Sequence, residues 1–252
     1  MKSTVIKTEK LSKTFSTGGV QQHVLKNIDL EIYEGDFTVI MGASGAGKST
    51  LLYALSGMDR PSLGKIEFAG ASIGELSGDK LAVFRRKNCG FVFQQIYLMD
   101  DMSLLDNAMA CGLLLSKDKK AVAARAADLF DRVGLEEIDT KKFPAQLSGG
   151  QQQRGAMVRA LINDPTVLFA DEPTGALNSA SGKAVLDILT ELNRAGKSIV
   201  MVTHDLHSAY RGNRILYLKD GAFFADFDAG RYEEADESRK QEIRTYLESV
   251  GW

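Results

Sequence analysis

The segment Gly42-Ala-Ser-Gly-Ala-Gly-Lys-Ser49 has the composition of a loop that binds phosphate groups. Its glycines permit a tight turn in which successive backbone N–H groups point at one anion. An apolar run at 37–41 precedes it and a helical pattern follows, so the positive end of a helix adds to the attraction. This context disfavours the alternative, a glycine turn with an incidental lysine. The predicted phosphate-binding residues are Gly42, Ser44, Gly45, Ala46, Gly47, Lys48, Ser49 and Thr50.

Two neighbouring acids, Asp171 and Glu172, end the apolar run that begins at residue 167. In a phosphate-binding loop of this type the lysine supplies charge for the β- and γ-phosphates and the Ser49 hydroxyl can bind Mg²⁺. Asp171 can complete that Mg²⁺ site, and Glu172 can act as the general base for an attacking water. The alternative is a charged strand end that faces solvent.

Strand-like and helical patterns alternate around these residues, which predicts an α/β fold. Short apolar, strand-like runs end at 41, 94, 171 and 203, whereas residues 103–162 follow helical spacing. A further helix is expected near 238–250, and its apolar residues are expected to pack on the protein's own core. Parallel sheets covered by helices place their ligand sites at the carboxyl ends of strands, which is where the motifs lie.

The composition is that of an ordinary globular protein of 252 residues, 44% hydrophobic and 25% charged. With 31 basic and 33 acidic residues the net charge is −2, so no excess of positive charge favours nucleic-acid binding. Cys89 and Cys111 lack metal-ligand spacing and are interpreted as buried thiols in a reducing compartment. The polar start and the absence of a long apolar stretch predict a cytosolic chain.

The segment LSGGQ at 147–151 resembles the signature of ATP-binding cassette (ABC) ATPases, and it lies between the two motifs above in that family's order. The resemblance covers about residues 3–226. It implies a P-loop NTPase fold with a RecA-like core, an antiparallel β subdomain and a helical insertion. It also implies an ABC ATPase domain at residues 1–230, followed by a C-terminal helical extension at 231–252. Within the ATPase domain, the RecA-like and β core comprises residues 1–94 and 160–226, and the helical subdomain comprises residues 95–159.

The same resemblance assigns roles to further residues. Gln94 is similar to the family's Q-loop glutamine, a ligand of ATP and of Mg²⁺ together with Ser49 and Asp171. His204 is similar to the catalytic switch histidine, and Phe15 stands where an aromatic stacks on adenine. Ser148, Gly149, Gly150 and Gln151 are implied to bind the ATP of an opposing subunit, and Ala176, Leu177 and Asn178 form the D-loop of the dimer interface.

The family resemblance therefore implies a head-to-tail dimer of two copies that sandwich two ATP molecules. A helix whose N-terminus is fronted by a serine and two glycines suits a γ-phosphate. Asn178 is a departure, since many relatives carry Asp there. An amide can still cap a helix that begins near Ser179, so it is expected to adjust communication between sites only.

The amino-acid sequence at 90–107 and 170–177 resembles that of the subfamily whose members work with permeases carrying large extracytoplasmic domains. Its members include macrolide exporters, lipoprotein-releasing ATPases, the cell-division cassette protein and bacitracin-type peptide-resistance transporters. The leading expectation is an ATPase at the cytoplasmic face of the plasma (inner) membrane, held there by a separate integral membrane permease. Export or extraction of an antimicrobial peptide, antibiotic or lipid-linked compound is expected. The alternative is transmembrane signalling or envelope-hydrolase regulation without transport.

The region from Gln94 to Asn107 is where family members touch the permease. Asp100 and Asp101 depart from the relatives, which more often have proline or an uncharged residue nearby. They are expected either to meet basic residues of the permease or to form a solvated acidic turn.

Overall fold

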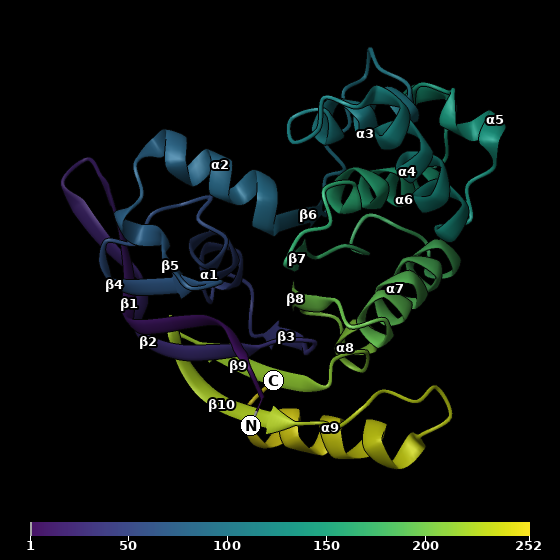
Figure 1. Cartoon of the computed structure of the whole chain (residues 1–252). Helices are drawn as coiled ribbons and strands as arrows, with labels where there is room; N and C mark the ends of the chain where they lie inside the picture. The colour runs from purple at the N-terminus through teal and green to yellow at the C-terminus, as the bar shows by residue number, and fades with distance from the viewer. Residues whose placement is uncertain (1) are drawn as a thin grey trace. The chain divides into compact units, whose positions relative to one another are not determined.

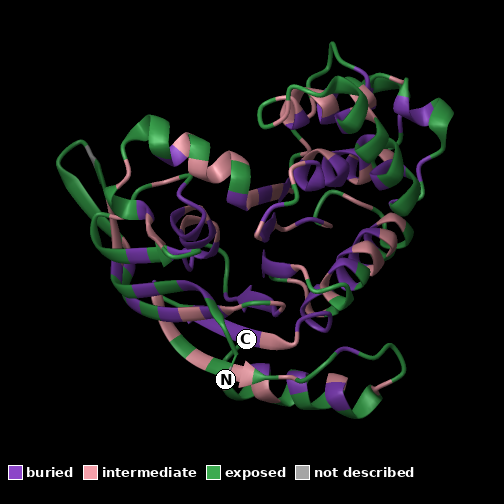
Figure 2. Ribbon diagram, viewed as in Figure 1, coloured by how far each residue is buried: buried purple, intermediate pink, exposed green. Residues whose placement is uncertain are grey.

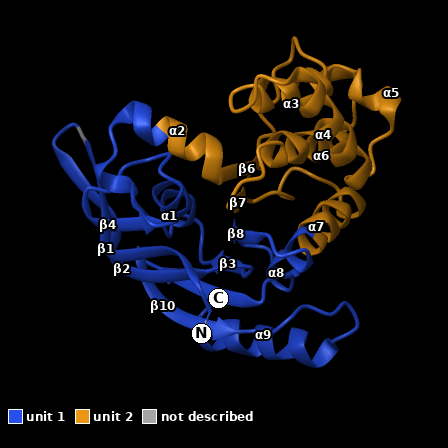
Figure 3. Cartoon of the chain, viewed as in Figure 1, with its two compact units in different colours: residues 1–81, 192–252 blue, residues 82–191 orange. Residues whose placement is uncertain are grey.

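The computed structural model describes residues 2–252 (Figure 1). These residues form two compact units (Figure 3). Unit 1 contains the chain up to Leu81 together with Leu192–Trp252, and unit 2 contains Ala82–Glu191. The helical subdomain expected at 95–159 lies inside unit 2, and the helical extension expected at 231–252 lies inside unit 1.

One sheet of unit 1 is antiparallel, with the order β2-β1-β4-β5. Alternating buried and exposed residues in its strands give it one apolar face and one solvated face. Its strands are β1 (Thr4–Thr17), β2 (Val20–Tyr33), β4 (Leu63–Phe68) and β5 (Ala71–Ser72).

The remaining strands of unit 1 are ordered β10-β9-β3-β8. β3 pairs in parallel with both β8 and β9, and β9 pairs in antiparallel fashion with β10. Every residue of β3 and β8 is buried (purple in Figure 2), as expected for continuous apolar runs in a covered parallel sheet. The strands are β3 (Phe37–Met41), β8 (Ser198–Val202), β9 (Arg214–Lys219) and β10 (Ala222–Asp228).

Helices complete unit 1. They are α1 (Lys48–Leu55), η1 (Ile73–Glu75), the start of α2 (Gly78–Asn88), α8 (Leu206–Ala209) and α9 (Glu237–Ser249). The C-terminal helix α9 buries Ile243 and Leu247 completely, and its Tyr246 ring stacks on Phe227 with the ring centroids 4.6 Å apart. The expectation that this helix packs on the protein's own core is confirmed.

Unit 2 combines a parallel strand pair with a group of helices. The pair is β6 (Cys89–Phe93) and β7 (Val167–Asp171). The helices are the larger part of α2, α3 (Leu104–Gly112), α4 (Lys119–Arg132), α5 (Glu137–Thr140), η2 (Pro144–Gln146), α6 (Gly149–Leu161) and α7 (Ser179–Arg194), whose last residues belong to unit 1. A Cβ at Gly155 of α6 would lie 2.6 Å from Leu104 of α3, so a glycine lets these two helices approach closely.

The two cysteines are free, half-buried thiols. Burial raises the pKa of Cys89 to about 12 and also raises the pKa of Cys111, which keeps both thiols protonated and unreactive near neutral pH. Among residues 2–252, no helix combines the length and the apolar character that crossing a bilayer requires.

Candidate functional site

The loop between β3 and α1 has the geometry that its glycines predict. Gly42, Gly45 and Gly47 all have positive φ values, of 153°, 79° and 99°. A Cβ at Gly42 would lie 2.2 Å from the carbonyl oxygen of Leu218, so no other residue fits there without moving the backbone of β9. The loop therefore presents its backbone N–H groups at the N-terminus of α1, as an anion-binding loop requires.

Lys48 places its ammonium group within this loop. The side chain is buried, and its Nζ donates to the carbonyl oxygens of Gly42 at 2.8 Å and of Ala43 at 2.9 Å. Ser49 and Thr50, in the first turn of α1, are half-buried, whereas Ser44 and Gly45 are exposed. A buried cation beside an exposed turn of N–H groups is an arrangement that attracts a polyphosphate.

The carboxyl ends of β3 and β8 bring His204 to the same edge of the sheet as the phosphate loop. Ile40 pairs with Val202, and the backbone N–H of Thr203 donates to the carbonyl oxygen of Ile40 at 3.2 Å. His204, the next residue, is exposed. Because the two strands are neighbours and parallel, both motifs follow from adjacent strand ends.

Phe15 lies on β1 and is 41% exposed. The Lys13 ammonium lies 4.8 Å from the centre of the Phe15 ring, and an ion pair of 2.6 Å to Asp59 fixes this ammonium. The β1–β2 hairpin reaches the phosphate loop, since a Cβ at Gly47 would lie 3.0 Å from the carbonyl oxygen of Val24. An exposed aromatic ring is thus available on a strand pair that borders the loop.

In unit 2 the strand ends of β6 and β7 bring Gln94 close to the two acids. Phe93 and Asp171 are register partners in the parallel pair, so Gln94 and Glu172 follow neighbouring strand ends. Gln94 also packs against the backbone after the acids, because a Cβ at Gly175 would lie 2.8 Å from its Nε2 atom.

Glu172 has an uncommon backbone conformation. Its φ is +45°, in the left-handed region that L-residues other than Asn and Asp rarely adopt. Such a conformation costs on the order of 1–3 kcal/mol and persists where the surrounding structure enforces it, often at functional sites. At Glu172 the backbone therefore turns away from the extended conformation of β7.

The signature segment forms the exposed N-terminus of α6. Ser148 is the N-cap, and its Oγ accepts from the Gln151 backbone N–H at 3.3 Å, while Gln151 Oε1 accepts from the Ser148 N–H at 3.0 Å. Gly150 is needed for packing, because a Cβ there would lie 2.6 Å from the Ser181 hydroxyl of α7. Gln151 is thus part of a capping box that holds the first turn.

The segment predicted to be the D-loop ends at a helix cap, as expected for Asn178. Asn178 Oδ1 accepts from the backbone N–H of Ser181 at 2.9 Å, at the start of α7. Leu177 lies beside the signature turn, since a Cβ at Gly149 would be 3.6 Å from its Cδ2 atom. The predicted D-loop and signature residues are therefore neighbours within unit 2.

Gln153 belongs to this region although its sequence position gave no signal for it. Its side chain is 1% exposed, and Nε2 donates to the carbonyl oxygens of Phe93 at 3.0 Å and Pro173 at 2.8 Å. One amide thus connects the signature helix to both strand ends. Three consecutive glutamines on a helix are typical of a solvent-exposed face. The burial of Gln153 is therefore evident only from its contacts in the structure.

The predicted site residues divide between the two units (Figure 3). Unit 1 contains Phe15, the phosphate loop and His204, and unit 2 contains Gln94, Asp171, Glu172, the signature and the D-loop. Within residues 2–252, no group of three or more His, Cys, Asp or Glu side chains could hold a metal ion. The predicted Mg²⁺ ligands, Ser49, Gln94 and Asp171, include only one carboxylate, so they would not form such a group.

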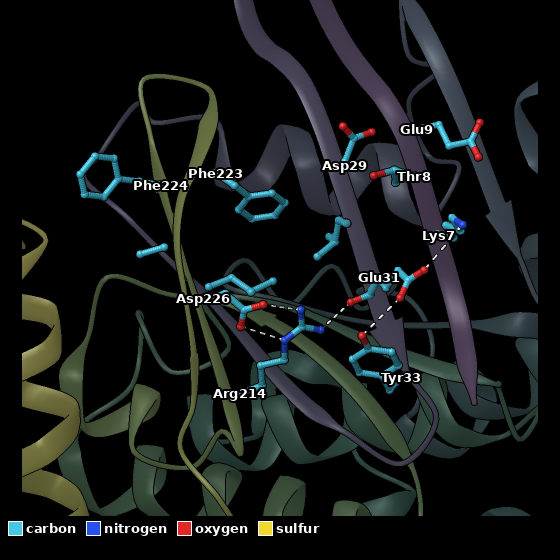
Figure 4. Close-up of a pocket in the computed structure, with 13 residues that line it drawn as sticks. Lys7, Thr8, Glu9, Asp29, Glu31, Tyr33, Arg214, Phe223, Phe224 and Asp226 are labelled. Carbon is cyan, nitrogen blue, oxygen red and sulfur yellow. Dashed lines mark hydrogen bonds and ion pairs between the residues drawn. The ribbon is translucent and has the colours of Figure 1, made fainter. Parts of the chain in front are cut away.

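A cavity of about 650 Å³ in unit 1 is lined by none of these residues (Figure 4). The Arg214 guanidinium in it forms a two-pronged ion pair with Asp226, at 3.0 and 2.6 Å, and donates to the Glu31 carbonyl oxygen at 2.5 Å. The Arg214 cation is therefore already paired, Lys7 forms an ion pair of 3.7 Å with Glu31, and Glu9 and Asp29 add further negative charge. Such a lining repels polyphosphate, so we exclude the cavity as the nucleotide site.

Comparisons with known proteins identify the family. The ABC transporter family model matches residues 25–175 of the chain. The chain belongs to the ABC transporter family. It is an ABC-type ATPase cassette, and the predicted P-loop fold with an antiparallel subdomain is confirmed by the solved cassettes that it resembles.

Curated relatives include the macrolide export ATP-binding/permease protein MacB of Pectobacterium atrosepticum, which is 43% identical over 94% of this chain and 36% of its own length. MacB of Escherichia coli is 44% identical over 88% of this chain and 34% of its own. The chain thus spans about a third of the length of these relatives.

Two solved structures illustrate the likeness. The ATP-binding cassette MJ0796, a dimer in a post-hydrolysis state with ADP and Pi, has a TM-score of 0.83 and 38% identity over 88% of this chain and 98% of its own. The cassette cbiO1 of Clostridium perfringens, part of an ABC transporter complex, has a TM-score of 0.82 and 26% identity over 98% of this chain and 93% of its own.

Proposed function

We propose that this cassette dimerises head-to-tail around two ATP molecules and powers a separate integral membrane permease that has a large extracytoplasmic domain. Export or extraction of an antimicrobial peptide, antibiotic or lipid-linked compound is the proposed work. The observation that carries the proposal is the pairing, in one chain, of a phosphate loop in unit 1 with an exposed, glycine-fronted helix N-terminus in unit 2.

In this proposal unit 1 binds the nucleotide. The loop N–H groups and Lys48 contact the β- and γ-phosphates, and the Phe15 ring stacks on adenine. Lys48 gives up its hydrogen bonds to the carbonyls of Gly42 and Ala43 in favour of phosphate oxygens. Exchange of neutral acceptors for charged ones makes this favourable.

Catalysis requires residues of both units in the proposal. Ser49, Gln94 and Asp171 offer only oxygen donors, which suits Mg²⁺, and they would hold the ion where it offsets phosphate charge. The Glu172 carboxylate accepts the proton of the water that attacks the γ-phosphate. His204 orients the γ-phosphate and that water.

The opposing subunit contributes its signature in this scheme. Ser148, Gly149, Gly150 and Gln151 present the N-terminus of α6 to the γ-phosphate of the partner's ATP, and hydrolysis loosens the interface. Ala176, Leu177 and Asn178 cross to the other subunit. A C2 arrangement makes the two sites equivalent. The dimeric cassette MJ0796 with ADP and Pi supports this assignment.

The loop from Gln95 to Ser103 is the proposed permease contact. The buried Asn107 side chain holds it from inside, through the carbonyl oxygens of Met99 at 3.2 Å and Met102 at 3.1 Å, while Arg159 donates to the Tyr97 carbonyl oxygen.

On the outside of this loop the side chains of Tyr97, Met99 and Met102 are exposed, next to Asp100 and Asp101. The backbone is thus fixed while apolar and acidic groups face outward. Such a surface suits a permease segment with both basic and apolar side chains.

The names of the curated relatives support the substrate class, since both are macrolide export proteins that combine ATP-binding and permease functions. A cassette bound to a permease in this way would lie at the cytoplasmic face of the plasma membrane. Nucleic acid is not a proposed partner, given the net charge of −2.

Co-purification with the membrane fraction tests the partner. The double variant Asp100→Lys/Asp101→Lys is expected to lose the permease while its ATP binding is unchanged. Asp128→Lys, an exposed acid on α4, is the matched control and should retain the permease. Equal recovery of the permease with both variants would contradict the proposed contact.

A further inference from the structure

The segment that carries His204 contains α8, a helix of only four residues, Leu206–Ala209. A helix of one turn has no stability of its own, because nucleation costs more than its few hydrogen bonds return. Its position is therefore set by its surroundings, since Ser208 and Ala209 are fully buried and groups at both ends of the helix bond to it.

At the N-terminal end the group is local. The Asp205 carboxylate accepts from the backbone N–H of His207 at 3.3 Å and of Ser208 at 2.7 Å, and the Asp205 N–H donates to the Thr203 hydroxyl at 2.9 Å. This end follows directly from the sequence, since Asp is a preferred N-cap.

At the C-terminal end the group comes from a distant part of unit 1. The last carbonyls of a helix have no partner within it. Here the Arg239 guanidinium, on α9, donates to the carbonyl oxygen of Tyr210 at 2.6 Å and also to that of Gly212. A cation at a helix C-terminus also interacts favourably with the helix dipole.

Arg239 is itself fixed. It is 6% exposed, its Nε donates to the Ala229 carbonyl oxygen at 2.8 Å, and Asp236 caps α9 by accepting from its backbone N–H at 2.9 Å. The Arg239 and Arg211 guanidiniums both lie over the ring of Tyr232, at 5.6 and 4.6 Å from its centre. Ile243 and Leu247 of the same helix are fully buried.

We propose that Arg239 is a positioning residue for ATP hydrolysis: by capping α8 from the C-terminal helix it holds the segment 203–212, and with it His204, at the edge of the sheet beside the phosphate loop. The inference rests on the proposed role of His204. The fork of guanidinium donors is what allows one side chain to bond several carbonyls, so lysine cannot replace it fully.

The test compares Arg239→Gln with the wild type in the full chain with Mg-ATP. Loss of the cap should lower kcat about 10-fold and leave the KM for ATP within about 2-fold, since a misplacement of 1 Å can cost up to 10²-fold in rate. Arg239→Lys, which keeps the charge, should recover part of kcat. Ile243→Val weakens α9 without touching the α8 carbonyls, and it should lower the melting temperature but not kcat.

Two further measurements separate positioning from general weakening. In a His204→Ala background, Arg239→Gln should cause no additional loss of kcat, because both changes remove the same contribution. Additive losses, an unchanged kcat in Arg239→Gln, or an equal loss in Ile243→Val would each overturn the inference.

The imidazole signals give a readout that needs no activity, since the chain has only three histidines. The ring signals of His204 should shift or broaden in Arg239→Gln and not in Ile243→Val, with the His23 signals unchanged in both. If the His204 signals are unchanged in Arg239→Gln, the inference is wrong whatever the effect on kcat. A wild-type rate in His204→Ala would instead contradict the proposed catalytic role of His204.

Discussion

The phosphate loop of unit 1 and the signature of unit 2 are both glycine-rich helix N-termini, but they are built differently. The first depends on backbone conformation, with Gly42, Gly45 and Gly47 in positive φ. The second depends on side chains, with a capping box at Ser148 and a buried amide at Gln153. A site built from the backbone is therefore disrupted mainly by substitutions of its own glycines and lysine. A site built from side chains also depends on contacts between residues that are far apart in the sequence.

This difference predicts that unit 1 substitutions act on ATP affinity and unit 2 substitutions on turnover and stability. His204, together with Arg239, which is proposed to position it, is the exception, because both residues lie in unit 1 and are proposed to act on turnover. The contacts of the His204 segment account for this exception. Side chains hold α8 at both ends, as side chains hold the signature helix of unit 2.

The largest effect is expected from Glu172→Gln in unit 2. Removal of the proposed general base should lower kcat by about 10²- to 10⁴-fold, while ATP binding persists and an ATP-bound dimer accumulates. Steady-state ATPase rates and size-exclusion chromatography with ATP measure the two outcomes. Glu191→Gln, an exposed acid on α7, is the control. Hydrolysis by Glu172→Gln at the wild-type rate would show that Glu172 is not the base.

Lys48→Ala in unit 1 should instead abolish tight ATP binding. The loss is expected to be about 10- to 100-fold in Kd, since hydrogen bonds to charged groups contribute roughly 1.5–3 kcal/mol. Titration with a fluorescent ATP analogue measures it, and Lys65→Ala on the exposed face of β4 is the control. A change in kcat alone would contradict the division between the units.

Gln153→Leu sharpens the comparison within unit 2. It leaves the carbonyl oxygens of Phe93 and Pro173 without their amide partner, which should cost about 1–3 kcal/mol of unfolding free energy and reduce turnover. Thermal unfolding and ATPase rates check it. Gln241→Leu on the exposed face of α9 should change neither.

The smallest effect is expected from Asn178→Asp. Either side chain can accept from the Ser181 N–H, so the cap on α7 should survive. The added charge lies on the proposed interface loop, so cooperativity or the basal rate should change more than ATP affinity. The Hill coefficient of the ATPase and the Kd for ATP decide this, and an effect on affinity alone would contradict it.

The sequence by itself determined the elements of the fold that depend on local chemistry. The sequence predicts β3 at residues 37–41 and β7 at residues 167–171, and the structure has the same bounds, because short continuous apolar runs bounded by a glycine-rich loop or by acidic residues favour buried strands. The phosphate loop, the Asn178 cap and the C-terminal helix followed for the same reason. Their hydrogen bonds and dihedral angles involve residues close together in the chain.

The tertiary structure alone decided the contacts that join distant segments. Arg239 reaches Tyr210, Gln153 reaches Phe93, and Glu172 takes a left-handed conformation that its residue type disfavours. Neither periodicity nor spacing encodes these features, because a buried guanidinium or amide satisfies whichever carbonyls packing brings near it. Residue types thus set which chemistry is available, and the folded chain sets which backbone groups hold it in place.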